Sequence, residues 1–149
     1  MRAYITFFLC VVVIGLLTHG VKEAKQIKVA TSGNSVIDAA IARNMPSEHI
    51  ALLTPVVYAI RRAENGRAGR EFGILHPRAI DTNLDTQAGW CAATVYKEWC
   101  RQGKPTNMGT FIPLLGKRYC PVGADNDPSG LNKNWVKNVT KFYNQEINK

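Results

Sequence analysis

One glutamate, Glu64, carries the strongest chemical signal in this sequence. It lies near the end of a segment that runs from Pro55 to Gly66, where a helical repeat places it on the apolar stripe with Val57 and Ile60. A carboxylate in such a stripe is costly, and the last turn of a helix also disfavours negative charge. Both effects raise the pKa of a carboxyl group. We therefore expect Glu64 to hold a proton near neutral pH, as protonation of a glycosidic oxygen requires.

A structural role is the alternative for the same carboxyl group. Its stem would pack in the core while its head either reaches out to solvent or pairs with Arg61, Arg67 or Arg70. Spacing alone favours this alternative, because most carboxyl groups with perturbed pKa values are structural.

The residues around Glu64 resemble a known family. The segment 59–66, Ala-Ile-Arg-Arg-Ala-Glu-Asn-Gly, and the segment 72–74, Phe-Gly-Ile, are similar to the core of the lytic transglycosylases and goose-type lysozymes. In that family the catalytic glutamate ends a helix within a Glu-Ser-Gly motif, and a Gly-Leu-Met-Gln motif follows. Here Asn65 replaces the serine, and the stretch from Gly73 matches the second motif only in part. The family's later Ala-Tyr-Asn-Ala-Gly element is not visible.

The resemblance covers residues 50–143 and implies both a fold and roles for particular residues. Part of it lies in the stretch 111–135, which is similar to a divergent branch of lysozyme-like bacterial and phage proteins. It implies a small, single-domain, mainly α, lysozyme-like fold in which Glu64 is catalytic.

Three further residues acquire roles through this resemblance. Gly73 and Ile74 would support the glutamate or bind substrate, and Tyr119 would steady the carboxyl group. For Tyr119, packing in the core at a helix end is the more common role of such an aromatic residue.

A single well-placed glutamate suits one reaction of this family. An ordinary glycosidase needs two carboxyl groups about the scissile bond. A lytic transglycosylase manages with one, because the C6 hydroxyl of the substrate attacks the anomeric carbon of the same sugar. Glu64 would first protonate the leaving oxygen and then take the proton of that hydroxyl. In a hydrolytic version, Glu71, Asp81 and Asp85 are the candidates for the second carboxylate.

The three tryptophans could stack on sugar rings. Trp99 and Trp135 fall on apolar stripes of their predicted helices, Trp135 together with Leu131 and Val139, so we expect both in the core. Trp90 points away from the stripe of its helix and is the best candidate for a sugar platform.

Metal and cofactor signals are weak. Asp125, Asp127, Ser129 and Gly130 match early positions of a calcium loop, but Val136 stands where a bidentate glutamate belongs. A capped turn explains these residues better. The histidines show no metal-ligand spacing, and we expect neither a metal nor a cofactor.

Helical elements must position these residues. Ser35 is a plausible N-cap for a first helix, Thr54-Pro55 marks the start of the second, to which a turn from Ser47 could join, and Asp85 is expected to cap the third. Between the second and third lies a long irregular loop or small hairpin. The predicted helices are 36–43, 55–65, 85–102, 111–119 and one containing 131–142. Strand signals are few and are confined to 27–30 and 70–80, so the class is mainly α.

The N-terminus predicts export. Ile5 to Leu17 is an apolar run that is short for a membrane span, and small residues at Thr18 and Gly20 offer a cleavage site. We expect a signal peptide over 1–20, a lead-in segment over 21–46 and a lysozyme-like domain over 47–149. The protein would act in the periplasm or outside the cell. If the run were retained, it would tether the protein to the membrane.

The net charge limits the kinds of partner that we expect, and the spacing of the cysteines limits the disulfides that could form. The net charge of +8 is spread along the chain, which suits attraction to an anionic polymer such as a cell wall. The sequence lacks a stripe of interleaved basic and aromatic residues of the kind that binds nucleic acid, so we do not expect a nucleic-acid partner. Cys91 and Cys100 are too far apart along one predicted helix to bond, so any disulfide would involve Cys120; three free thiols are the alternative.

The sequence therefore predicts a peptidoglycan-cleaving enzyme, a lytic transglycosylase or a muramidase-type hydrolase, that acts as a monomer on glycan strands. The alternative is a noncatalytic glycan-binding or cell-wall-binding protein, or an envelope or virion structural protein, that retains the fold.

Overall fold

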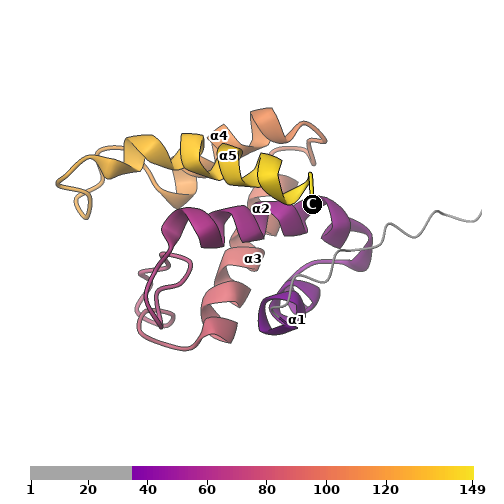
Figure 1. Cartoon of the computed structure of the whole chain (residues 1–149), viewed down its shortest axis with the longest axis horizontal. Coiled ribbons are helices and arrows are strands. Elements are labelled where there is room, and N and C mark those ends of the chain that lie inside the picture. The colour runs from indigo at the N-terminus through magenta and orange to yellow at the C-terminus, as the bar shows by residue number, and fades with distance from the viewer. Residues whose placement is uncertain (1–34) are drawn as a thin grey trace, which may run out of the picture.

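Helices make up the regular structure of the computed structural model, which describes residues 35–149 (Figure 1). In that range there is no strand, so the predicted mainly α class and single helical domain are confirmed and the alternative of a small hairpin is wrong. The predicted signal peptide, the first part of the lead-in and the strand signal at 27–30 lie outside the described residues. The elements are α1 (Ser35–Asn44), α2 (Ser47–Glu64), α3 (Leu84–Arg101), α4 (Met108–Tyr119), the 3-10 helix η1 (Leu131–Asn134) and α5 (Trp135–Glu146).

Two helix pairs enclose the core. The helix α5 lies along α2, and α1 packs against α3 (Figure 1). The apolar stripe of α2 that the sequence predicts is real, because Val56, Val57 and Ile60 are fully buried. Phe72 from the loop after α2 is also fully buried and anchors that loop to the core. No helix in the range 35–149 is both long and apolar enough to cross a membrane.

The helix α2 begins earlier than the predicted start at Thr54-Pro55. It is continuous from Ser47, with Pro55 inside it and Leu53 fully buried before the proline. A proline within a helix removes one backbone hydrogen bond, and burial of the preceding turn against the core offsets that loss. The helix ends at Glu64, because Asn65 adopts a left-handed conformation with φ 42° and donates its N–H to the carbonyl of Arg61.

The start of α3 also differs from the prediction. The side chain of Asn83, not that of Asp85, accepts the N–H of Thr86 at 2.9 Å and caps the helix. Asp85 instead forms an ion pair with Arg43 of α1. An asparagine one position before the helix can reach the third backbone N–H, whereas Asp85 already lies in the first turn.

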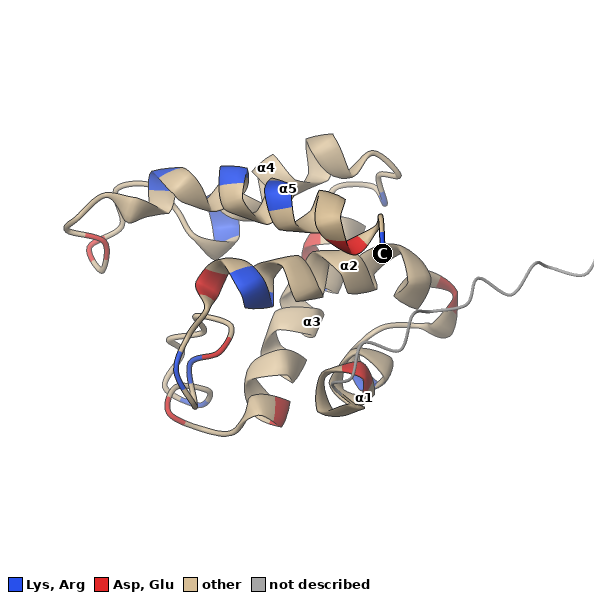
Figure 2. Cartoon of the chain, in the orientation of Figure 1, with Lys and Arg blue, Asp and Glu red and all other residues tan. Residues whose placement is uncertain are grey.

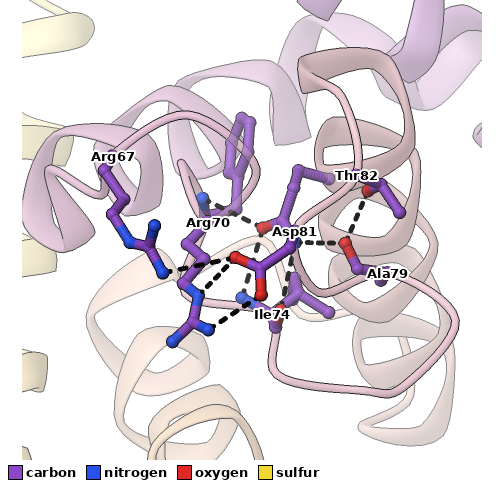
Figure 3. A network of polar contacts seen from close by, with 8 residues as sticks. Arg67, Arg70, Ile74, Ala79, Asp81 and Thr82 are labelled. Carbon is purple, nitrogen blue, oxygen red and sulfur yellow. Dashed lines mark hydrogen bonds and ion pairs between the residues drawn. The ribbon is translucent and has the colours of Figure 1, made fainter.

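The loop between α2 and α3 is irregular but firmly held (Figure 3). Asp81 lies between Arg67 and Arg70 and accepts two hydrogen bonds of 2.9 Å from Arg70. Gln87 of α3, fully buried, contacts the loop backbone from the inside: its Oε1 accepts N–H groups at both 72 and 74, and its Nε2 donates to carbonyls at 74 and 79. These contacts fix the segment 72–76 relative to the end of α2.

Candidate functional site

The carboxyl group of Glu64 lies where α2, the following loop and α5 meet. The indole Nε1–H of Trp135, the first residue of α5, donates to Glu64 Oε1 at 2.8 Å. On the other side lies Gly73, so close that a Cβ added there would fall 2.3 Å from Glu64 Oε2. The present position of the Glu64 side chain therefore requires glycine at position 73.

Burial raises the pKa of Glu64 above its ordinary value, and the hydrogen bond from Trp135 opposes that rise. The alternative in which an arginine neutralises the carboxylate is not what the structure contains. Arg61 donates to the backbone carbonyl of Glu71, while Arg67 and Arg70 bind Asp81. Among residues 35–149 no ion pair includes Glu64. Desolvation without a cationic partner favours the protonated carboxyl group, the state that a general acid needs.

Trp135 is the functional contact that the sequence analysis missed. Its prediction as a core residue is correct, because only 6% of it is exposed and Val139 beside it is fully buried. The prediction for Leu131 is wrong: it lies in η1 and is 64% exposed, because the regular α-helix begins only at Trp135. A buried indole needs an acceptor for its N–H, and that requirement was the available signal. Helical spacing could not reveal that the acceptor comes from a helix far away in the chain.

Tyr119 lies next to the site, where it contacts the loop after α2 and the indole of Trp135. Its hydroxyl donates to the carbonyl of Phe72 at 2.7 Å, and its ring stacks on Trp135 with centroids 5.3 Å apart. Burial raises the pKa of Tyr119 well above its ordinary value, so the hydroxyl remains a donor. Tyr119 thus contacts both neighbours of Glu64, the indole of Trp135 and the loop that carries Gly73.

An open pocket of about 460 Å³ adjoins this arrangement at Gly73. The loop residues 73–76 form one wall, and Trp90 with Thr94 of α3 forms another. Trp90 stacks on His76 with ring centroids 4.4 Å apart. Four residues singled out from the sequence, namely Gly73, Ile74, Trp90 and Tyr119, thus line one pocket, completed by Arg118 and Asn126. Glu64 itself is not a lining residue but lies against Gly73 at the pocket's edge.

The three candidates for a second carboxylate lie elsewhere. Asp81 is engaged by Arg70 and Arg67, which hold the pKa of its carboxyl group below the ordinary value, and Asp85 is paired with Arg43. Glu71 is 8% exposed, and its Oε2 has no hydrogen-bond partner among the described residues. None of the three lines the pocket.

The predicted capped turn accounts for the calcium-like segment. The Asp127 carboxylate accepts the backbone N–H groups of Leu131 at 2.8 Å and Asn132 at 2.9 Å, so both of its oxygens hold the start of η1. In the described part of the chain, no group of three or more acidic, histidine or cysteine side chains could hold a metal ion.

The cysteines match the alternative of three free thiols. Among residues 35–149, Cys91, Cys100 and Cys120 form no disulfide with one another. Burial raises the pKa of Cys91 to about 12 and that of Cys120 to about 11, so both thiols stay protonated at neutral pH.

Replacing Trp135 by Phe tests how the indole controls Glu64. The variant retains an aromatic ring beside Tyr119 but loses the N–H that lowers the carboxyl pKa. We expect the pKa of Glu64 to rise further, so that its proton is lost only at higher pH. An NMR titration of the Glu64 side-chain carbon would measure this shift.

Trp99→Phe is the matched control for that titration. Trp99 is 3% exposed and also donates its indole N–H, to the carbonyl of Pro105 at 2.8 Å, but this bond does not involve Glu64. Loss of a buried indole hydrogen bond is therefore common to both variants. An equal shift of the Glu64 pKa in both would mean that general loosening of the core, and not the Trp135 contact, sets it.

Comparison with known proteins adds no relative: no protein-family model, no curated protein and no solved structure matches this chain. The class that the fold and the site define is a small helical domain in which a half-buried carboxyl group, held by an indole N–H, lies next to an open pocket lined in part by aromatic residues.

Proposed function

We propose that this protein is a peptidoglycan-cleaving enzyme of lysozyme-like fold, a lytic transglycosylase with Glu64 as its single general acid and base. The observation that carries the proposal is the state of Glu64: a half-buried carboxyl group that forms no ion pair within residues 35–149 and is held by one indole N–H next to a pocket. A raised pKa favours the protonated carboxyl group, which is the form that can deliver a proton to a glycosidic oxygen.

The same contacts support both steps of the reaction. In the first step Glu64 protonates the leaving oxygen and becomes a carboxylate. The Trp135 N–H, already 2.8 Å from Oε1, then stabilises the new charge, because a hydrogen bond to an ionised acceptor is stronger than one to a neutral acceptor. In the second step the carboxylate takes the proton of the sugar's C6 hydroxyl as that oxygen attacks the anomeric carbon.

The pocket supports a glycan as substrate. A volume of about 460 Å³ is within the usual range for a ligand site. The stacked rings of Trp90 and His76 offer an aromatic surface, and Thr94 with Asn126 adds polar groups for hydroxyl and acetamido substituents. Glu71, Asp81 and Asp85, the candidates for a second carboxylate, do not line this pocket, which favours the single-carboxylate reaction over hydrolysis by a carboxylate pair.

The exposed basic side chains support an anionic polymer as partner. The end of α4 and the length of α5 carry Lys and Arg on the surface (Figure 2). Peptidoglycan lies beyond the cytoplasmic membrane, in the compartment to which the N-terminal apolar run is predicted to direct the chain. We propose that the exported protein works there as a monomer, without metal or cofactor.

Incubation of the purified protein with a peptidoglycan suspension tests the proposal. We expect the suspension to clear, and mass analysis of the released fragments to find 1,6-anhydro ends, which the intramolecular attack produces. Reducing ends would instead establish a hydrolase and overturn the transglycosylase mechanism. If no fragment is released but the protein sediments with the polymer, the noncatalytic glycan-binding alternative is correct.

A further inference from the structure

The pocket beside Glu64 has an uneven charge that the proposed reaction does not use. Its lining includes the cationic side chain of Arg118 and the imidazole of His76, and it includes no acidic residue. A neutral sugar would not need the cation. A ligand that carries an anionic group would gain from both the cation and the absence of a competing carboxylate.

Arg118 is free to bind such a group. Its side chain is 59% exposed. Within residues 35–149, its Nε forms an ion pair with Glu98 Oε2 at 3.8 Å, a distance longer than a hydrogen bond. The Glu98 carboxylate is already engaged by two closer partners, Arg101 and Gln102. The long contact orients the Arg118 guanidinium without using its terminal N–H groups, which can form a two-pronged pair with a carboxylate.

An aromatic pair in the lining of the same pocket offers a surface for a sugar ring. Trp90 and His76 stack at 4.4 Å, and the Nδ1 of His76 accepts the backbone N–H of Arg78 at 3.2 Å, which holds the imidazole in place. A ring against this aromatic pair has Arg118 on the lining of the same pocket. A carboxylate substituent on that ring or on its neighbour would therefore meet the guanidinium.

We propose that Arg118 makes this pocket selective for amino-sugar units that carry a carboxylate over neutral amino-sugar polymers. In peptidoglycan this is the lactyl carboxylate of a unit without a stem peptide, or a carboxylate of the stem peptide. This inference rests on the proposed function, whose substrate class it narrows. Arg118 acts as a specificity-determining residue and takes no part in proton transfer.

Binding measurements test the selectivity apart from catalysis. In the full chain carrying Glu64→Gln, so that ligands are not consumed, calorimetry compares a muramic-acid-containing tetrasaccharide with chitotetraose, which has no carboxylate. We expect the carboxylated ligand to bind about tenfold more tightly, the size typical of a charge-assisted hydrogen bond. Arg118→Gln should bind both ligands equally, with unchanged affinity for chitotetraose.

Arg101→Gln is the matched control. Arg101 also pairs with Glu98 and is exposed to a similar degree, at 49%, but it does not line the pocket. It should retain the full tenfold preference. The inference is overturned if Arg118→Gln keeps the preference, or if Arg101→Gln loses as much of it, since the effect would then reflect net charge alone.

The clearing assay of the wild-type chain separates the two proposals. Absence of cleavage with a retained Arg118-dependent preference would refute the proposed reaction and leave the selectivity standing. Cleavage without the preference would support the proposed reaction and refute the selectivity proposed for Arg118.

Discussion

Glu64→Gln should abolish glycan cleavage while leaving the protein folded. Glutamine has the same shape and its Oε1 can still accept the indole N–H of Trp135, but it has no proton to give. General acid catalysis contributes about 10²- to 10⁴-fold to such reactions, so we expect at least a 100-fold loss of fragment release. Quantitative mass analysis of soluble fragments against time measures it.

The stability of the same variant has a predicted pH dependence. The folded pKa of Glu64 is raised above the ordinary 4.5, so the folded state binds this proton more tightly than the unfolded chain. Wild-type stability therefore falls as the pH rises from the unfolded to the folded pKa, and the loss is complete above the folded pKa. Glu64→Gln does not ionise, so its stability relative to wild type should improve across that window. Urea unfolding at pH values below and above 4.5 tests this.

Glu146→Gln is the matched control for both measurements. Glu146 is also largely buried, with 7% of its side chain exposed, but it is ion-paired with Arg62 and Lys149 at the end of α5. This variant should keep its cleavage activity, and it should lose stability at neutral pH instead of gaining it. Equal activity of Glu64→Gln and wild type would show that Glu64 is not the acid.

Gly73→Ala should disable the site with only a modest loss of stability. The added Cβ would lie 2.3 Å from Oε2 and 2.6 Å from Cδ of Glu64, so the carboxyl group must move. The atoms that must give way are the end of a flexible side chain, not backbone, and the fold itself can persist. A displacement of about 1 Å can reduce catalysis by about 100-fold, and we expect a loss of that order in fragment release.

Gly123→Ala is the control that separates displacement of the Glu64 carboxyl group from the free-energy cost of alanine in a left-handed backbone conformation. Gly73 and Gly123 both have positive φ, 66° and 78°, but nothing lies within 4 Å of a Cβ at position 123. Each alanine should cost about 1–2 kcal/mol of unfolding free energy for its left-handed conformation. Only Gly73→Ala should also lose activity and shift the Glu64 pKa. Equal activities of the two variants would show that the position of the carboxyl group does not matter.

The sequence alone was enough to predict the class of the fold and the unusual position of Glu64 on an apolar stripe. Apolar spacing over Val56, Val57 and Ile60 was enough to predict the buried stripe of α2 and the place of Glu64 on it, because a helix has a fixed period. The motif resemblance also directed attention to Gly73, Ile74 and Tyr119, which the structure brings together with Trp90 around one pocket. The function that this resemblance implies remains a proposal.

Tertiary structure alone decided the surroundings of Glu64. Local spacing favoured a structural glutamate whose head reaches solvent or pairs with an arginine. The structure contains no such pair, because Arg61 donates to the loop backbone, while Arg67 and Arg70 bind Asp81. The partner that Glu64 does have, Trp135, is separated from it by most of the remaining chain and meets it only because α5 packs along α2. Periodicity fixes which face of a helix is buried, but only the packing of distant helices fixes which polar atom a buried group finds there.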